Sequence, residues 1–310
     1  MAALIFYSKP DPWEEWGPAL AAELPHIEMR DWDDPGDDGQ VEYVLVWQPP
    51  RDGLGRFPNL KCILSLGAGV DHLLVDTDLP DGVPVVRMVE EALTVGMTEF
   101  VTLHVLRHHR RQLDLEAQQR DKVWKAVLTP LASERKVGLM GLGELGADAA
   151  RVLLALGFDL ASWTRAPKDM AGIESFHGVD GLGPFLARTE ILVALMPATH
   201  ETTGILNKDL FDRLPKGASL INSGRGGLQV EADILAALES GQLSQATLDV
   251  FETEPLPADS PLWDHPRVTI SPHNAALTIA RTGAEAVAAN IRRFEAGEPL
   301  RGLVDRDAGY

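Results

Sequence analysis

Short runs of apolar residues alternate with amphipathic stretches along nearly the whole chain. Runs of this length between helical patterns are typical of parallel strands in β-α-β units. A first series of predicted strands covers residues 4–7, 43–47, 62–66 and 83–87, and a second covers 136–140, 158–163, 191–195, 219–222, 246–249 and 268–270. The pattern therefore predicts an α/β protein with two Rossmann-like or flavodoxin-like domains, each containing a parallel sheet.

A long helical pattern over residues 94–120 separates the two series of strands. Its apolar residues recur at helical spacing, at Phe100, Leu103, Val105, Leu106 and Leu113. A final helix is predicted over residues 276–295, and we expect it to return to the first domain. The predicted organisation is a first domain of residues 1–95, an inserted domain of residues 96–276, and residues 277–310 completing the first.

Length and composition agree with a two-domain globular protein. The chain has 310 residues, of which 45% are hydrophobic and 24% charged. Its single cysteine, Cys62, rules out an intramolecular disulfide and favours a reducing compartment. No apolar run reaches the roughly 18 residues of a membrane helix, and the first residues lack the basic region of an export signal. We therefore predict a cytoplasmic protein without a membrane partner.

The formal net charge of -18 at pH 7 narrows the choice of partners. An acidic surface repels phosphate backbones, so nucleic acid is not expected to bind. An anionic small molecule would have to be held by individual cationic side chains against the overall field.

Residues 136–146 combine a strand, the pattern G-x-G-x-x-G and the start of a helix. Gly141 permits the tight turn, Gly143 lets the backbone approach a pyrophosphate, and Gly146 lets the helix pack closely on the strand. The amides of Glu144 and Leu145 begin the helix, whose N-terminus attracts phosphate. Because a second strand follows at residues 158–163, the segment predicts a dinucleotide site.

The end of that second strand indicates which dinucleotide binds. Proteins that bind NAD tend to place an acidic residue there, whereas this chain has Thr164, Arg165 and Lys168. A guanidinium can grip a 2′-phosphate that a carboxylate would repel. NADPH is therefore the predicted cofactor, with NADH possible, and the alternative is an exposed loop with incidental cations.

Three segments of the second half carry polar residues at predicted strand ends: Arg225 in residues 220–227, Asp249, Glu252 and Glu254 in residues 248–257, and His273 in residues 270–276. Each alone is more often structural or solvated. Since the carboxyl ends of parallel strands meet at one edge of a sheet, the three segments together predict an Arg–Glu–His site.

The order and spacing of these motifs resemble the D-isomer-specific 2-hydroxyacid dehydrogenase family. Residues 141–146, 222–227, 249–257 and 271–276 carry the resemblance, and residues 66–71, 196–207 and 303–306 extend it over nearly the whole chain. The resemblance implies a hydride transfer between a nicotinamide cofactor and a small 2-oxo or 2-hydroxy acid. It also makes residues 1–95 and 277–310 the substrate domain and residues 96–276 the NAD(P)-binding domain.

The resemblance also implies roles for single residues. Arg225 would hold the substrate carboxylate and polarise the carbonyl, His273 would be the acid/base, and Glu254 would orient it. The backbone amides of Gly67, Ala68 and Gly69 would cradle the substrate carboxylate. Cofactor contacts are expected from Met196, Pro197, Thr202, Ser223, Gly224 and Asp249, the last toward the nicotinamide carboxamide. Glu252 has no implied role, and no metal is expected.

Within the family, residues 47–50 and 66–71 look most like bacterial glyoxylate/hydroxypyruvate reductases, a group that favours NADPH. Trp47 is predicted either to line the substrate pocket or to belong to the core. Gly224 departs from the commoner alanine before the arginine and is expected to add flexibility without affecting catalysis. The resemblance further implies a homodimer. The alternatives are a dehydrogenase of bulkier or phosphoglycerate-type substrates, or a non-catalytic NAD(P)-sensing protein like the corepressors of this family.

Overall fold

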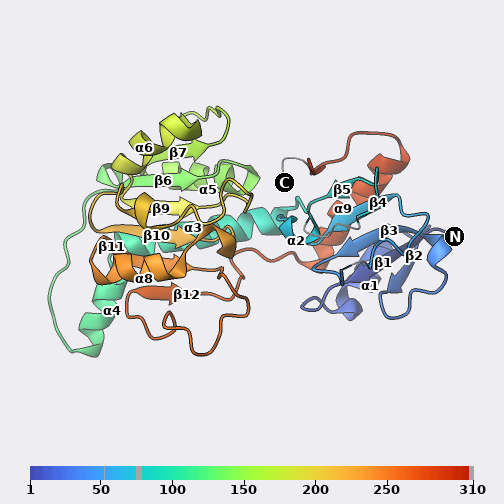
Figure 1. Ribbon diagram of the computed structural model, residues 1–310, viewed down its shortest axis with the longest axis horizontal. Coiled ribbons are helices and arrows are strands. Elements are labelled where there is room, and N and C mark those ends of the chain that lie inside the picture. The colour runs from blue at the N-terminus through green and yellow to red at the C-terminus, as the bar shows by residue number, and fades with distance from the viewer. Residues whose placement is uncertain (52, 75–78, 307–310) are drawn as a thin grey trace. The chain divides into compact units, whose positions relative to one another are not determined.

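The computed structural model describes residues 1–51, 53–74 and 79–306 (Figure 1). The chain divides into two compact units. The first unit joins Met1–Leu93 with Leu277–Tyr310, and the second is Thr94–Ala276. Among the described helices, none combines the length and apolar character that crossing a bilayer requires.

The first unit is built on a five-stranded parallel sheet. Its strands are β1 (Ala3–Tyr7), β2 (Glu28–Asp31), β3 (Val41–Val46), β4 (Cys62–Ser65) and β5 (Val85–Val86). They lie in the order β2-β1-β3-β4-β5, which is the flavodoxin-like order. The unit also contains α1 (Trp13–Glu23), the short η1 (Asp38–Gln40), α2 (Asp71–Leu74) and α9 (Ala280–Glu295). Helices α1 and α9 pack against each other.

The second unit contains a seven-stranded parallel sheet. Its strands are β6 (Lys136–Met140), β7 (Asp159–Thr164), β8 (Ile173–His177), β9 (Ile191–Ala194), β10 (Ala218–Asn222), β11 (Leu243–Leu248) and β12 (Val268–Ile270). Their order is β12-β11-β10-β9-β6-β7-β8, so the direction of winding reverses between β6 and β9. Open α/β sheets bind ligands beyond the carboxyl ends of the strands at such a switch point.

The helices of the second unit connect and flank these strands (Figure 1). They are α3 (Glu91–His109), whose first turn lies in the first unit, α4 (Gln112–Arg120), α5 (Glu144–Ala155), α6 (Gly178–Arg188), α7 (Lys208–Phe211) and α8 (Glu231–Glu239), with the short turns η2 (Ala132–Glu134) and η3 (Gly226–Leu228). The predicted α/β class with two parallel sheets is confirmed, because all strand pairs described within these sheets are parallel.

Two edge strands, β2 and β8, were absent from the prediction. The segment Glu28–Asp31 is largely polar, and Ile173–His177 is only partly buried. Each pairs with a single neighbouring strand, so backbone hydrogen bonds rather than an apolar run define it. Polar edge strands also resist pairing with other chains.

The predicted continuous helix over residues 94–120 is wrong, because the chain turns between α3 and α4. Arg111 adopts a left-handed backbone conformation with φ 54°, and its amide donates to the carbonyl of His108 at 3.1 Å. Asp114 then accepts from both Arg111 and Arg267, each at 2.7 Å. These contacts stabilise a reversal that the helical spacing of apolar residues does not reveal.

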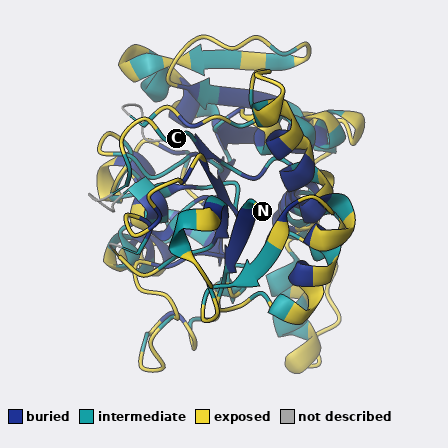
Figure 2. Cartoon of the chain, turned by 90° about the vertical axis from the view of Figure 1, so that its right-hand side faces the viewer, coloured by how far each residue is buried: buried dark blue, intermediate teal, exposed yellow. Residues whose placement is uncertain are grey.

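The strands of both sheets are largely buried, whereas the outer faces of many helices are exposed (Figure 2). In the second unit one apolar cluster includes Phe185, Phe211 and Leu220, and another includes Val101, Leu139 and Leu153. The core of the first unit includes Ile5, Val44 and Ile63. Helices on both faces of each sheet explain why these strands read as continuous apolar runs.

Helix α3 places buried histidines against the seven-stranded sheet. Nδ1 of His108 lies 2.9 Å from the hydroxyl of Ser219 on β10, and Nε2 lies 2.9 Å from that of Thr247 on β11. Nδ1 of His104 lies 3.4 Å from the same threonine hydroxyl. Burial lowers the pKa of His108 to about 3 and that of His104 to about 4. Both imidazoles are therefore neutral near pH 7.

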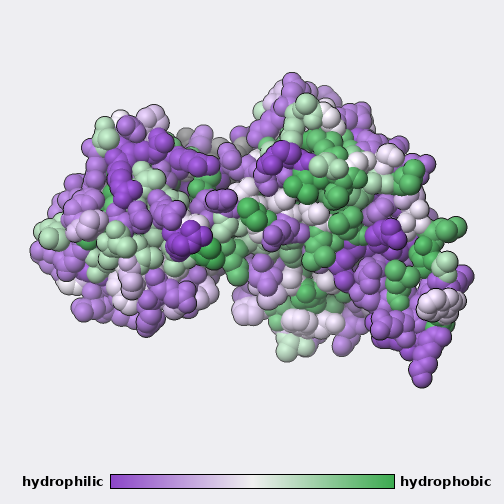
Figure 3. All heavy atoms as spheres, turned by 180° about the vertical axis from the view of Figure 1, so that it is seen from behind, coloured by the Kyte–Doolittle hydropathy of each residue, from purple (hydrophilic) through white to green (hydrophobic). Residues whose placement is uncertain are grey.

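The segment after α4 exposes large apolar side chains. Val123, Leu128 and Leu131 are exposed, and Trp124 is fully so. Figure 3 shows the molecule from behind, where hydrophobic residues (green) are interspersed with hydrophilic residues (purple) on the surface. Exposed tryptophans are enriched where proteins contact partners.

Candidate active site

The glycine turn after β6 has the geometry of a dinucleotide site. Gly141 has φ 106°, and a Cβ there would lie 3.0 Å from the carbonyl carbon of Leu195. A Cβ at Gly146 would overlap the carbonyl oxygen of Gly141, so the helix can approach only without a side chain. A Cβ at Gly143 would meet nothing within 4 Å, which leaves open the space a phosphate would approach. Glu144 and Leu145 begin α5, so their amides are at its N-terminus.

The loop after β7 lies close to this turn. The ammonium of Lys168 donates to the carbonyl of Leu142 at 3.1 Å, which ties the loop to the glycine turn. The hydroxyl of Thr164 donates to the carbonyl of Ala166 at 2.7 Å and shapes the loop. Arg165 is exposed beside them. Two cations on the loop beside the glycine turn fit a cofactor that carries a 2′-phosphate.

The loop after β9 is held by its own threonines. The hydroxyl of Thr202 donates to the carbonyl of Pro197 at 2.7 Å and accepts from the amide of Thr199 at 2.8 Å. The side chain of Met196 is buried in the apolar core. Thr202 therefore shapes the loop, and the side chain of Met196 belongs to the core.

The loop after β10 contains Ser223, Gly224 and Arg225. The Ser223 hydroxyl is buried and has no hydrogen-bond partner within the described part of the chain. A Cβ at Gly224 would lie 2.9 Å from the carbonyl oxygen of Met196. Gly224 is thus explained by close packing, not by the flexibility expected from the sequence. The Arg225 guanidinium donates to the carbonyl of Gly224 at 2.8 Å.

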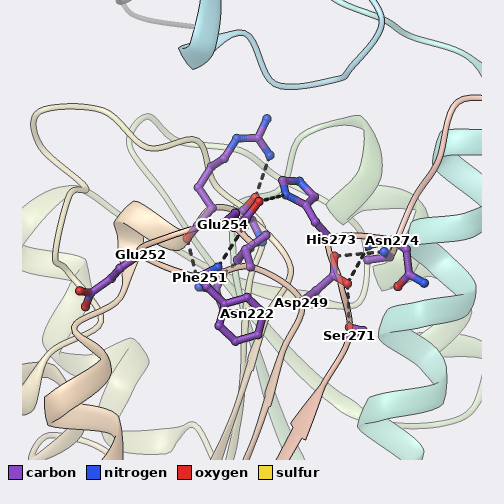
Figure 4. A network of polar contacts seen from close by, with 12 residues as sticks. Asn222, Asp249, Phe251, Glu252, Glu254, Ser271, His273 and Asn274 are labelled. Atoms are coloured by element: carbon purple, nitrogen blue, oxygen red, sulfur yellow. Dashed lines mark hydrogen bonds and ion pairs between the residues drawn. The ribbon is translucent and has the colours of Figure 1, made fainter. Parts of the chain in front are cut away.

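His273 and Glu254 form a direct pair. Nδ1 of His273 lies 2.7 Å from Oε2 of Glu254, and the two side chains are about one-third exposed, 36% and 33% (Figure 4). The other carboxylate oxygen of Glu254 accepts from the amide of Phe251 at 3.0 Å. Burial alone would raise the pKa of Glu254, but His273, the Phe251 amide and the charge of Arg225 together hold that pKa below its usual value. Glu254 is therefore an ionised acceptor for the imidazole.

Asp249 anchors the loop that carries His273. Its carboxylate is buried and accepts from the Ser271 hydroxyl at 2.7 Å and from the amides of Asn274 and Ala275 at 3.0 Å each (Figure 4). Both carboxylate oxygens are thus engaged by the loop. A contact between Asp249 and the nicotinamide carboxamide remains a prediction from the resemblance. Asp249 would have to make that contact in addition to its three hydrogen bonds with the loop.

Glu252, which had no implied role, points away from His273 (Figure 4). Its carboxylate accepts from the amide of Glu231 at 2.7 Å, and the carboxylate of Glu231 accepts from the amide of Glu252 at 2.9 Å. This exposed exchange ties the loop after β11 to the start of α8.

In the first unit, Trp47 lies against the Gly67 backbone, where a Cβ would overlap its ring, and it packs on His72 with ring centroids 4.3 Å apart. The amide of Gly67 donates to the Ser65 hydroxyl at 3.2 Å. Within the described residues, the amides of Ala68 and Gly69 form no hydrogen bond. The predicted carboxylate cradle therefore depends on Ala68 and Gly69 more than on Gly67.

The structure brings Arg225, Glu254 and His273 to the carboxyl ends of β10, β11 and β12.

The structure also shows two site-supporting residues that sequence reasoning missed. Asn222 and Gln229 are buried, and both bind backbone groups of the loops that carry Arg225 and Glu254. Among the described residues, no group of three or more His, Cys, Asp or Glu side chains could hold a metal ion.

The chain is similar to known proteins over nearly its whole length. Residues 102–275 match the NAD-binding domain of the D-isomer specific 2-hydroxyacid dehydrogenases. A glyoxylate/hydroxypyruvate reductase A of Serratia proteamaculans is 42% identical over an alignment 312 positions long that covers 99% of each chain.

Two solved structures are also similar. A D-isomer specific 2-hydroxyacid dehydrogenase from Xanthobacter autotrophicus Py2, in complex with NADPH and MES, is 46% identical with a TM-score of 0.96, covering 100% of this chain and 99% of that one. An NADPH-dependent glyoxylate/hydroxypyruvate reductase from Sinorhizobium meliloti, in complex with NADP and sulfate, is 42% identical with a TM-score of 0.93 and full coverage of both chains. The resemblance drawn from the sequence motifs is confirmed. The chain belongs to the D-isomer specific 2-hydroxyacid dehydrogenase family and is an oxidoreductase that uses a nicotinamide cofactor.

Proposed function

We propose that this enzyme reduces glyoxylate and hydroxypyruvate to the corresponding 2-hydroxy acids with NADPH. The contact between His273 and Glu254 at 2.7 Å, beside the charge of Arg225, carries the proposal. The names of the Serratia and Sinorhizobium relatives support the substrate class.

In this proposal His273 is the general acid. An ionised carboxylate only accepts hydrogen bonds, so Nδ1 facing Glu254 must carry a hydrogen. The other ring nitrogen, Nε2, is then the one that hands a proton to the substrate oxygen. Glu254 fixes the orientation of the ring, and its negative charge stabilises the imidazolium that precedes transfer. In the reverse direction the same nitrogen removes the proton of the hydroxyl group.

Arg225 acts on the substrate as a fixed cation. Its guanidinium has several donors in one plane, which suits a carboxylate and the adjacent carbonyl of a 2-oxo acid. A positive charge at the carbonyl oxygen stabilises the negative charge that develops there during reduction. Since the chain carries a net charge of -18, a local cation is needed to retain an anionic substrate.

A bound reduced nicotinamide would supply the hydride. Gly141, Gly143 and Gly146 would hold its pyrophosphate, and Arg165 with Lys168 would bind a 2′-phosphate, which favours NADPH over NADH. Ser223 and Gly224 are assigned to the cofactor by the family resemblance. The amides of Ala68 and Gly69 would receive the substrate carboxylate, and Trp47 would limit the size of the side chain admitted.

The test is a comparison of kcat/KM for glyoxylate, hydroxypyruvate, pyruvate and phenylpyruvate with NADPH and with NADH. The proposal predicts that glyoxylate and hydroxypyruvate have the highest kcat/KM with NADPH. Their kcat should be about 1 per second or faster. Preference for phenylpyruvate would indicate another dehydrogenase of the family. Binding of NADPH without turnover of any of the four acids would indicate a nucleotide-sensing protein.

We also propose a homodimer in the cytoplasm. The exposed side chains of Val123, Trp124, Leu128 and Leu131 support a second copy of the chain as the partner. Light scattering should give twice the chain mass, and the paired substitution Trp124→Ser and Leu128→Ser should give the monomer mass. A monomer in the unaltered protein would contradict the dimer.

A further inference from the structure

The side chain of Gln229 joins the loops that carry the proposed catalytic residues. It is 3% exposed, and its Oε1 accepts from Nδ2 of Asn222 at 2.8 Å. Its Nε2 donates to the carbonyl of Val250 at 2.9 Å and to Oε1 of Glu231 at 3.4 Å. Asn222 ends β10 and Val250 follows β11, so one buried amide links the ends of two adjacent strands.

Each end of this link continues to a catalytic side chain. At one end, Nδ2 of the Asn222 side chain also donates to the backbone carbonyl of Arg225 at 3.1 Å. Oδ1 of the same side chain accepts from the backbone amide of Gly224 at 3.1 Å. At the other end, the residue after Val250 is Phe251, whose amide donates to Glu254 at 3.0 Å. The chain of bonds therefore runs from the Arg225 backbone to the carboxylate that holds His273.

The two loops also touch directly. A Cβ at Gly226 would overlap the carbonyl group of Phe251, so the backbones pack against each other without an intervening side chain. Two further contacts join the strand ends and their loops. The backbone amide of Asp249 donates to the carbonyl of Asn222 at 3.0 Å. Glu231 and Glu252 exchange hydrogen bonds, but both residues are partly or fully exposed, so water competes for these bonds.

We propose that Gln229 is a positioning residue that sets the place of the Arg225 guanidinium relative to the Glu254–His273 pair. The inference rests on the roles proposed above for those three residues. A reduction needs the carbonyl polarised and protonated in one geometry, and a displacement of about 1 Å can lower a rate by about 10²-fold. Gln229 touches none of the reacting atoms and acts through the two loops.

Two substitutions separate the ends of the link. Gln229→Leu removes all three side-chain hydrogen bonds, to Asn222, Val250 and Glu231, at similar size. Gln229→Glu keeps an acceptor for Asn222 but places an oxygen against the carbonyl of Val250 and a negative charge beside Glu231. It therefore disrupts the Glu254 side and spares the bond to Asn222. Gln242→Leu is the matched control, because Gln242 precedes β11 and donates to the carbonyls of Phe211 and Leu214 at 2.7 and 3.0 Å. Gln242 therefore lies at the amino end of β11, whereas Val250 follows the carboxyl end of that strand.

Turnover with glyoxylate and NADPH gives the first readout. Gln229→Leu and Gln229→Glu should lower kcat/KM by ~10-fold to 10²-fold, mainly through kcat, as for misplaced catalytic groups. The Kd of NADPH should change much less than kcat/KM, because the glycine turn that would hold the pyrophosphate lies outside the link. Gln242→Leu should lower Tm with kcat/KM unchanged. Equal losses of activity in the Gln229 and Gln242 variants, or a loss of NADPH binding parallel to kcat/KM, would overturn the proposal.

A second readout does not depend on glyoxylate being the substrate. The NMR signal of the proton between Nδ1 of His273 and Glu254 reports the geometry of that pair directly. It should shift or broaden in Gln229→Glu and stay unchanged in Gln242→Leu. Absent turnover in the unaltered enzyme would overturn the proposed substrate alone. An unchanged signal in Gln229→Glu would overturn the positioning role.

Discussion

The backbone amide of His273 donates a 2.8 Å hydrogen bond to the carbonyl of Asp249, and His273 has φ 53°. A side chain other than glycine in this left-handed region costs of order 1–3 kcal/mol when the surroundings impose it. The Asp249 carboxylate supplies that constraint through Ser271, Asn274 and Ala275. A buried carboxylate thus holds the loop that presents the imidazole to Glu254.

Substitution Asp249→Asn should therefore affect both stability and catalysis. The backbone amides of Asn274 and Ala275 each donate to a different oxygen of the Asp249 carboxylate. In either orientation of the new asparagine side chain, its NH₂ group would therefore face one of these backbone N–H groups. Leaving a buried donor unsatisfied costs about 1–3 kcal/mol of unfolding free energy, measurable by urea denaturation. We expect kcat to fall as well, because the His273 loop relaxes. Asp233→Asn, which alters an exposed acceptor for the Lys208 amide, is the control. Equal stability of the two variants would show that Asp249 does not anchor the loop.

Substitution His273→Ala should lower kcat with glyoxylate by ~10²–10⁴, the usual contribution of a positioned general acid. The Kd of NADPH should change little, because the residues assigned to the cofactor phosphates lie on other loops. Glu254→Gln should also lower kcat, since a neutral amide no longer stabilises the imidazolium. Glu252→Gln is the matched control, two positions from Glu254 and bound to α8 instead. An undiminished rate in His273→Ala would remove that residue from the mechanism.

Substitution Arg165→Ala should weaken NADPH more than NADH. A charge-assisted hydrogen bond is worth about 1.5–3 kcal/mol, so the Kd of NADPH should rise by about tenfold or more. Isothermal titration with both cofactors measures the difference. Arg151→Ala, which removes a cation of α5 paired with Asp148, should leave both affinities nearly unchanged. Equal weakening of the two cofactors in Arg165→Ala would show that the loop does not bind the 2′-phosphate.

The buried histidines predict how stability depends on pH. The folded-state pKa of His108, about 3, lies below its unfolded value of roughly 6.5, so the unfolded chain takes up the proton first as pH falls. Stability is complete above about pH 6.5 and is lost toward pH 3, by about 1.4 kcal/mol per pH unit for one proton. His104 behaves alike, with a pKa of about 4.

Urea denaturation between pH 7 and 4.5 measures this loss. His108→Gln should be less stable at pH 7 but should show a shallower decline on acidification. His26→Gln, at an exposed position, should reproduce the slope of the unaltered protein. Identical slopes in all three proteins would exclude His108 as the source of acid sensitivity.

Much of the candidate site could be predicted from sequence because it follows the geometry of parallel sheets. Arg225, Glu254 and His273 each follow a predicted strand, and parallel strands end at one edge. The roles of the glycines in the turn could also be predicted from the sequence. The structure agrees, because a Cβ at Gly141 or Gly146 would crowd nearby backbone atoms.

The features that were missed depend on contacts between distant segments. Gln229 has the same sequence signature as any solvated glutamine, and only the folded backbone places the Val250 carbonyl against it. Asp249 was assigned to the cofactor by resemblance, whereas its three loop donors come from residues 22 to 26 positions later. Strand β2 lacks an apolar pattern because it lies at a sheet edge.

The central claim is that Arg225 and His273 act on one 2-oxo acid in one transition state. A double-mutant cycle on kcat/KM for glyoxylate with NADPH tests it, using Arg225→Gln, His273→Gln and the double variant. Each single substitution should cost at least ~10²-fold. The double variant should lose much less than the product of the two losses, because groups that act as a unit are not additive. A fully multiplicative loss, or no loss in either single variant, would contradict the account.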